Sequence, residues 1–575
     1  MLHLTSIILE TKNYRRASAA LLAALITAGL ATTASAQTAT TYIWNNSNAG
    51  ATPTQTLDWF TGGTNTAGLW SGNPVSGNTN TIQFFQDTNT ALGYTGVATQ
   101  TANINNGGNA FELKTLTLGG KASTNNGVAG SMLMTISGDA LNFSSATGGT
   151  INLTSTANYT PTRTLNYDVG SNIIIGTSTQ TSALTIAGSG QGTYTFSGII
   201  SALKSDSSLT KTGTSTAILT KANTYTGKTT ISQGTLQLGN GQGTGKLDIT
   251  GVIESNGTFA INRNNVVAQG SDFSGAAITG TGGLSQIGTG TTTLNTANSY
   301  SGLTLVSAGT LVLNGSNTSK TGGTQVGNGS GGTLILGTEA NGGLAGGTIT
   351  FNNGTIQSSD ANSRSISNVI AFGTVKNFAS GGTGGLAFTN NGPVTLTALT
   401  TFIINANTSF AQSFTGSNIG ITKNGTAILT LSGVNTFTGV TTVSAGTLAT
   451  DATGTFGQGN ISIGLTTAAT LTFGNGNSIA DTATFTIGKY ATINLGAFSE
   501  TVGGLTSLTG IALANGTYTV NNSDSAFNLS TLFGGAKFNG TGSLIVSSIP
   551  EPATYAALVG LGILGFAVNR RRKTS

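Results

Sequence analysis

Hydrophobic residues along this chain occur in short runs that alternate with polar residues, as they do in half-buried strands. Leu116 and Leu118 alternate with threonine in one run, and Val394 and Leu396 do so in another. Glycine and asparagine separate the runs as turn residues. Helix-forming Lys and Glu are scarce between the runs, so the pattern predicts an all-β protein.

Three segments of the chain share one spacing of glycine, asparagine, aromatic residue and leucine, and no insertion interrupts it. Such a repeat is typical of stacked structural units. The predicted repeat positions are Gly213, Asn223, Tyr225, Gly227 and Gly234; Gly288, Asn298, Tyr300, Gly302 and Gly309; and Gly425, Asn435, Phe437, Gly439 and Gly446.

A unit of this length cannot bury its apolar face alone, but stacked units share a continuous core. Glycine can take the positive φ of a tight corner, and an asparagine there can bond to its own backbone and stack on the next asparagine. Since corners rather than two-residue hairpins join the strands, we predict a right-handed parallel β-helix, a solenoid.

The repeat resembles the autotransporter-associated β-strand repeat over residues 209–238, 284–313 and 421–450. The second copy departs from this pattern, because Ser285 and Gln286 replace its Thr-Lys pair. The resemblance implies a passenger-type β-helix.

The last residues, 550–575, combine Pro550, Glu551 and Pro552 with a 16-residue apolar run and then Arg570, Arg571 and Arg572. The run approaches the roughly 20 residues of a transmembrane helix, and the basic cluster would stay cytoplasmic. This tail resembles a PEP-CTERM sorting tail, which implies an exosortase-like transpeptidase as partner. A plain membrane anchor remains the alternative.

The first residues, 1–36, have a basic start, an apolar stretch and small residues that end at Ala34 and Ala36. This arrangement predicts a cleaved secretory signal peptide, with an uncleaved anchor as the alternative.

The body between the two terminal segments is electrically neutral. Residues 37–549 carry 15 basic and 15 acidic side chains, so nothing predicts nucleic-acid binding. The chain has no cysteine, and its one histidine is His3. We therefore expect no disulfide, no thiolate or histidine metal site, and no catalysis that needs an imidazole.

Aromatic residues gather near both ends of the body. Residues 37–110 contain all three tryptophans, and we predict an N-terminal cap with the first solenoid turns there, followed by the solenoid over 111–549. The aromatic residues near the N-terminus are Tyr42, Trp44, Trp59, Phe60 and Trp70, and a second cluster comprises Tyr518, Phe527, Leu529, Phe533 and Phe538. A carbohydrate-stacking platform is the other interpretation of the tryptophans.

Some β-helices process polysaccharides with paired carboxylates. The candidates here are Asp58, Asp87, Glu112, Asp206, Asp248, Glu254 and Asp272, with Lys204, Lys246 or Arg263 as partners. They share no common offset in the repeat, so surface charge explains them and we expect neither an enzyme nor a cofactor. Two functions stay open, beside the simpler possibility of a passive secreted filler without a specific ligand. One is an exported structural or adhesive protein of the cell surface or matrix that could bind polysaccharide, and the other is a polysaccharide lyase or hydrolase.

Deletion of residues 550–575 should leave folding intact and misplace the protein, because the tail contributes nothing to the predicted stack. Cell fractionation and the intact mass of the mature protein would measure location and cleavage. A truncated chain that still reached its normal location would contradict the sorting prediction.

Overall fold

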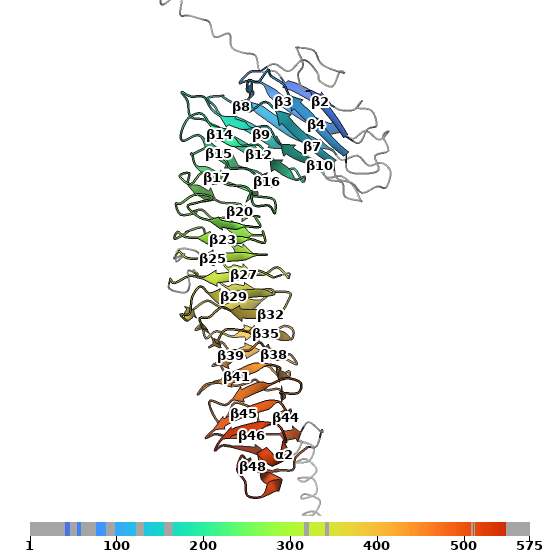
Figure 1. Ribbon diagram of the computed structural model, residues 1–575, viewed down its shortest axis with the longest axis vertical. Coiled ribbons are helices and arrows are strands. Elements are labelled where there is room, and N and C mark those ends of the chain that lie inside the picture. The colour runs from blue at the N-terminus through green and yellow to red at the C-terminus, as the bar shows by residue number, and fades with distance from the viewer. Residues whose placement is uncertain are drawn as a thin grey trace, which may run out of the picture.

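The computed structural model describes residues 41–45, 54–58, 76–87, 98–121, 132–154, 165–315, 321–329, 331–339, 344, 346–507, 510 and 512–547. In these residues the chain forms an elongated stack in which strands follow one another along the axis in sequence order (Figure 1). The predictions of an all-β protein and a parallel solenoid are confirmed.

Two sheets build the N-terminal part of the solenoid and share each turn. The first sheet has eight strands: β1 (Thr41–Asn45), β3 (Thr81–Asp87), β6 (Thr115–Lys121), β9 (Gly149–Leu153), β12 (Ala183–Ala187), β15 (Ser208–Lys211), β17 (Thr229–Ile231) and β19 (Ile253–Ser255). The second sheet has 13 strands: β2 (Thr54–Asp58), β4 (Ala98–Ile104), β7 (Met132–Gly138), β10 (Leu165–Val169), β13 (Tyr194–Phe196), β16 (Thr216–Leu219), β18 (Thr235–Leu238), β20 (Thr258–Ile261), β22 (Gly283–Gln286), β24 (Thr304–Val306), β26 (Thr324–Val326), β28 (Ile349–Phe351) and β31 (Ile370–Phe372).

A third sheet completes the N-terminal turns, and a fourth forms turns further along the chain. The third sheet contains β5 (Phe111–Glu112), β8 (Leu141–Phe143), β11 (Ile173–Ile175) and β14 (Ile200–Ala202). The fourth sheet has 12 strands: β21 (Val266–Ala268), β23 (Thr291–Leu294), β25 (Thr310–Leu313), β27 (Thr333–Leu336), β29 (Gly354–Ser358), β32 (Asn377–Gly381), β35 (Thr400–Ile404), β38 (Ile421–Asn424), β40 (Thr441–Val443), β42 (Ile461–Ile463), β44 (Thr484–Ile487) and β47 (Gly504–Ser507).

The fifth sheet lies towards the C-terminal end and contains β30 (Arg364–Ile366), β33 (Leu386–Phe388), β36 (Thr408–Phe410), β39 (Ile428–Leu431), β41 (Gly446–Thr450), β43 (Ala469–Thr472), β45 (Ala491–Gly496) and β49 (Lys537–Gly540). Two small sheets remain: β34 (Val394–Thr395) with β37 (Phe414–Thr415), and β46 (Ser499–Val502) with β50 (Ser543–Val546) and β48 (Gly516–Thr519).

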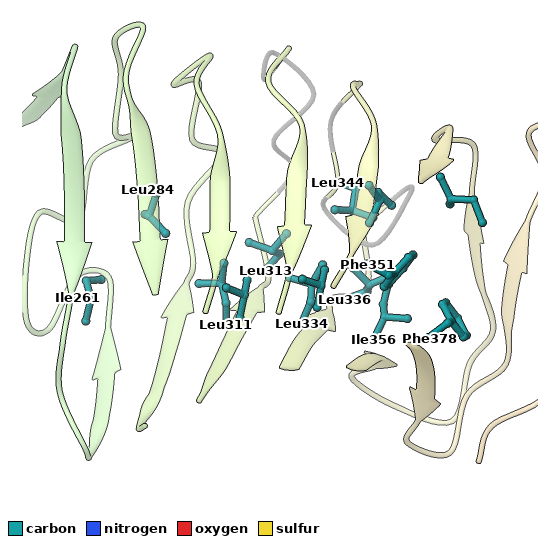
Figure 2. Packing of buried hydrophobic residues seen from close by; sticks show 14 of the residues in the cluster. Ile261, Leu284, Leu311, Leu313, Leu334, Leu336, Leu344, Phe351, Ile356 and Phe378 are labelled. Carbon is teal, nitrogen blue, oxygen red and sulfur yellow. The ribbon is translucent and has the colours of Figure 1, made fainter. Parts of the chain in front are cut away.

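The core is a column of apolar side chains that continues from turn to turn. Leu311 pairs with Leu334, which pairs with Ile356, and all three are buried. Figure 2 shows these side chains beside one another between successive turns. Because side chains in a strand alternate between faces, every second residue joins this column and the others face outward.

Phenylalanines fill the core in the C-terminal half. The ring of Phe410 lies between four others: its centroid is 4.6 Å from that of Phe388 in a stacked arrangement, and 5.3 to 5.7 Å from those of Phe378, Phe414 and Phe402 in edge-on arrangements. Such contacts add to the burial of apolar area.

The C-terminal end of the stack is covered by chain of a different kind. Strand β48 pairs antiparallel with β50, and the short helices η3 (Ser525–Phe527) and α2 (Leu529–Leu532) follow it. The predicted aromatic cluster is present, because Tyr518 lies 5.4 Å from Phe527 and Phe533 lies 5.8 Å from Phe538 between ring centroids. A cover of this kind keeps a sheet end from pairing with another chain.

The predictions for the two termini lie outside the described residues. These are the signal peptide at 1–36, with Ala34 and Ala36, and the tail at 550–575, with its Pro-Glu-Pro motif and arginines. Of the N-terminal aromatics, Tyr42 and Trp44 lie on β1 and the rest fall outside. Neither helix in the described part is long and apolar enough to cross a membrane.

Replacing Phe410 with Ala should destabilise the turns around β36 by about 3–5 kcal/mol, because it opens a cavity beneath four rings. Hydrogen exchange of β33, β36 and β39 would measure this loss locally. The matched control is Leu399→Ala, since Leu399 is 60% exposed and its loss should change stability by less than about 0.5 kcal/mol. Equal effects of the two substitutions would contradict the packing described here.

Candidate functional site

The predicted repeat positions lie at two corners of each turn, which we name the first corner and the Asn corner. The side chains of the repeat asparagines point into the solenoid. In each repeat a strand ends at the first corner, a second strand follows, and the Asn corner comes next. The paired residues of adjacent turns are Lys211 and Ile231, Gln286 and Val306, and Lys423 and Val443. One turn of the repeat therefore takes 20 residues, the difference between 211 and 231.

A fully buried lysine occupies the first corner in two repeats. The Nζ of Lys423 donates to the carbonyl oxygens of Asn424, Gly425 and Ala445 at 2.9–3.0 Å. The Nζ of Lys211 donates to Thr212 and Gly213 at 2.6 and 2.8 Å. Burial lowers the pKa of each lysine to about 8. Each ammonium group thus binds main-chain carbonyl oxygens of the corner.

The second repeat fills this corner with a neutral group. Nε2 of Gln286 donates to the carbonyls of Gly288 and Gly290 at 2.8 and 3.2 Å. Its Oε1 needs a donor in return, and the buried hydroxyl of Thr292 supplies one at 2.6 Å. In the two lysine repeats the residues at the position of Thr292 are Ala217 and Leu429. Neither has a hydroxyl group, and none is needed, because lysine has no acceptor atom that would require a donor.

The repeat asparagines bond to the main chain of neighbouring turns. Oδ1 of Asn435 accepts the N–H of Phe414 at 2.8 Å, and its Nδ2 donates to the carbonyl of Thr455 in the following turn. Asn223 does the same between Ile200 and Lys246. The expected bond to the local backbone is present, since Nδ2 of Asn435 also donates to Gly433.

Asn298 differs from the other two asparagines in its second contact. Its Oδ1 accepts the N–H of Ile278, but its Nδ2 donates to Oε1 of Gln269 at 3.2 Å. The contacts of all three residues therefore hold adjacent turns together, through the main chain and, for Asn298, also through a glutamine.

Each aromatic repeat residue is buried beside a threonine four residues later. The hydroxyl of Tyr225 lies 2.8 Å from that of Thr229, and the hydroxyl of Tyr300 lies 2.7 Å from that of Thr304. In the third repeat Phe437 has no hydroxyl, and Thr441 instead donates to the carbonyl of Phe456 at 2.8 Å. This threonine keeps a constant spacing of four residues from the aromatic residue in all three repeats.

The repeat glycines serve two physical purposes. Five of them have positive φ, as expected for corners: Gly213, Gly234, Gly309, Gly425 and Gly446. The other four do not, which corrects the expectation: Gly227, Gly288, Gly302 and Gly439. A Cβ at Gly227 would lie 2.3 Å from the carbonyl oxygen of Ser207. These four positions exclude a side chain because the preceding turn lies too close.

The structure brings three of the candidate charged residues together. Oδ1 of Asp272 lies 2.9 Å from Nη1 of the buried Arg263 and 3.0 Å from Nζ of Lys246. Burial disfavours the charged carboxylate, but hydrogen bonds from Ala268 N–H, Lys246 and Arg263 outweigh it and hold the pKa of Asp272 below its usual value.

Arg263 also donates to the carbonyls of Gly243 and Gly245 at 3.1 and 3.0 Å, so it holds a glycine-rich loop against the solenoid. The cluster lies where β19 ends the first sheet and β21 begins the fourth. Its contacts join chain segments at this change of sheets, which is a structural role.

The other candidate carboxylates make local contacts. Glu254 pairs with exposed Lys228, and Asp248 accepts from the N–H and hydroxyl of Thr250. Asp206 is exposed, as is Lys204, and the N–H of Glu112 bonds to Ser76. The side chains of Asp58 on β2 and Asp87 on β3 lie outside the description. Among the described residues, no group of three or more His, Cys, Asp or Glu could hold a metal ion.

These features define a parallel β-solenoid repeat protein whose recurring polar residues are buried at corners. Comparison with protein families then gives two matches. The passenger-associated-transport repeat matches residues 209–238, 284–313 and 421–449, and the PEP-CTERM protein-sorting motif matches residues 548–573. The suspected resemblances are confirmed, and the chain carries both features.

No curated protein and no solved structure matches this chain. The repeats and the sorting motif together indicate an exported, surface-associated repeat protein.

The two ways of filling the first corner can be exchanged. Lys423→Gln should cost about 1–3 kcal/mol, because the new Oε1 would be buried without a donor. Adding Leu429→Thr supplies the hydroxyl that Thr292 supplies to Gln286. In a double-mutant cycle the two substitutions together should cost about 1–2 kcal/mol less than the sum of the single costs.

Hydrogen exchange of β38 to β41 or denaturant unfolding would measure this cycle. The matched control pairs Lys423→Gln with Leu448→Thr, a buried leucine on β41, and should show no such coupling. Additive costs for the first pair would contradict the proposed exchange.

Proposed function

We propose that the mature chain is a non-enzymatic structural or adhesive rod of the cell surface or extracellular matrix, and that an exosortase-like transpeptidase processes its tail. One observation carries the proposal. The recurring polar residues of the repeat point inward and bond to the main chain, so repetition here builds length rather than a row of reactive sites.

A partner can contact only the outward-facing side chains of the rod. On the fourth sheet some of these side chains are aligned in register from strand to strand. Half-exposed residues with a hydroxyl or amide group pair in register across seven consecutive strands: Asn377, Thr401, Thr422, Thr442, Ser462, Thr486 and Thr506. We name this set the hydroxyl row. Its members recur at about 4.8 Å, the distance between adjacent strands.

A neutral polysaccharide is the partner class that suits the hydroxyl row. The row carries no charge, and the body of the chain is neutral overall. Hydroxyl and amide groups can both donate and accept hydrogen bonds, as sugar hydroxyls do. Each bond to a sugar would be weak, but a polymer could engage many at once, and simultaneous contacts multiply affinity.

The sorting motif supports the proposal for the tail. It matches residues 548–573, which include the predicted Pro550-Glu551-Pro552 and the terminal arginines. A motif of this class implies an exosortase-type sorting machinery at the membrane. Anchoring in the membrane before cleavage is part of the proposal.

The alternative of a polysaccharide lyase or hydrolase needs two carboxylates that face one substrate. Asp272, the most buried of the candidates whose side chains are described, instead forms ion pairs with Arg263 and Lys246. Glu254 forms an ion pair with Lys228. These ion pairs indicate that the carboxylates stabilise the fold. We therefore favour a structural or adhesive function over a polysaccharide lyase or hydrolase.

Replacing Thr422 and Thr442 together with Asp should weaken binding to the neutral exopolysaccharide of the native host by about tenfold, because two ionised groups interrupt the row and bind water strongly. Cosedimentation of the full chain with the purified polymer would measure this. The matched control places Asp at Thr350 and Ala371, which are paired outward positions on the second sheet.

Equal binding by both double variants would show that the hydroxyl row is not the contact face. Release of sugar products during the same incubation would support the enzyme instead. Circular dichroism of each variant would establish that the solenoid remains folded.

A further inference from the structure

One buried carboxyl group at the C-terminal end of the rod has an oxygen atom without a partner. Glu500 lies on β46 and is 1% exposed. Its Oε1 accepts the N–H of Ile479 from the preceding turn. Its Oε2 is buried and has no hydrogen-bond partner among the described residues. A buried acceptor in this state is costly, so the group needs an explanation.

Glu500 takes the place of an asparagine in a column of corner residues. The column can be followed through hydrogen bonds between successive turns: Nδ2 of Asn435 donates to the carbonyl of Thr455, the N–H of Phe456 donates to the carbonyl of Ser478, and the N–H of Ile479 donates to Oε1 of Glu500. Both Asn435 and Glu500 accept the N–H of a residue 21 positions earlier.

The two side chains differ in their second atom. Nδ2 of Asn435 is a donor and bonds to the carbonyls of Gly433 and Thr455. Oε2 of Glu500 can donate only when it carries a proton. A neutral glutamic acid therefore has the donor and acceptor groups of the amide, whereas an ionised one has two acceptors.

The surroundings of Glu500 favour the neutral form. The paired strand β50 contains Ser543, Leu544, Ile545 and Val546, and none of these carries a charge. The segment that supplies the N–H groups of Ser478 and Ile479 contributes one charge, the carboxylate of Asp481, which has the same sign. Burial is the largest cause and raises the pKa of Glu500 to about 7, although the N–H groups of Ile479 and Ser478, which face the carboxyl group, oppose the rise; Asp481 adds to it.

We propose that Glu500 holds the C-terminal cover, residues 499–507, 510 and 512–547, against the preceding turn when it is protonated. In its neutral form it joins the cover to the turn before, as Asn435 does further up the column. In its ionised form it leaves a buried charge, and the cover opens more often. The cover leads directly into the sorting motif at residue 548, so its opening exposes the chain beside that motif.

The sign of the pH effect follows from the two pKa values. Below about 4.5, the ordinary value, the carboxyl is protonated in both the folded and the unfolded chain. Between 4.5 and about 7 only the folded form keeps its proton, so stability falls as pH rises. Above about 7 the loss is complete, and stability no longer depends on this group.

The test compares the full-length protein with Glu500→Gln, whose amide reproduces the neutral carboxyl. At about pH 8, hydrogen exchange of residues 476–507 and 512–547 should be at least about tenfold slower in the variant, because each pKa unit between the folded and unfolded values corresponds to a factor of ten. At about pH 5 the two proteins should exchange alike. Comparison at equal pH removes the intrinsic pH dependence of exchange.

Two further variants control the comparison. Glu254→Gln neutralises a partly buried glutamate that pairs with Lys228 far from the cover, and it should leave exchange of the cover unchanged. Asn435→Asp places a carboxylate in the same column, and it should make exchange of β37 to β41 depend on pH. Equal exchange of Glu500→Gln and the natural chain at about pH 8 would overturn the proposal, as would faster exchange of the variant at both pH values.

Discussion

The structure depends on the requirement that each turn of the solenoid must satisfy the main-chain groups of the turns beside it. Along the strands the parallel ladders do this. At the corners the ladders stop, and carbonyl and N–H groups would be buried without partners, each at a cost of about 1–3 kcal/mol. Lys211, Lys423, Asn223 and Asn435 supply the missing partners from inside the rod.

This requirement concerns hydrogen-bond donors and acceptors rather than charge. Gln286 with Thr292 does in one repeat what Lys423 does in another, although only the lysine is ionised. Thr441 finds a main-chain partner where the aromatic residue lacks a hydroxyl. A corner can hold any side chain whose buried polar atoms all find hydrogen-bond partners. The repeats can therefore differ in sequence at the corners and still stack on one another.

The same requirement separates the inside of the rod from its outside. The polar residues that recur are used for construction, so recognition has to depend on the outward-facing side chains. Those are short and mostly neutral, as in the hydroxyl row, and they suit repeated weak contacts with a long polymer better than one strong site. The buried cluster of Arg263, Asp272 and Lys246 lies where the sheets change and holds a loop.

The sequence by itself determined the fold class, the three repeats and the C-terminal aromatic cluster, because alternation and fixed spacing are local properties of the chain. It did not show that each repeat would occupy different sheets. The first lies on the first and second sheets, the second on the second and fourth, and the third on the fourth and fifth. The segments between repeats have unequal lengths, and only their packing decides where on the circumference the next repeat begins.

The tertiary structure likewise decided that Gly227 is needed for close approach rather than for a turn, and that Glu500 takes the place of an asparagine. Both depend on contacts with residues about 20 positions away, which the stacking of turns brings together.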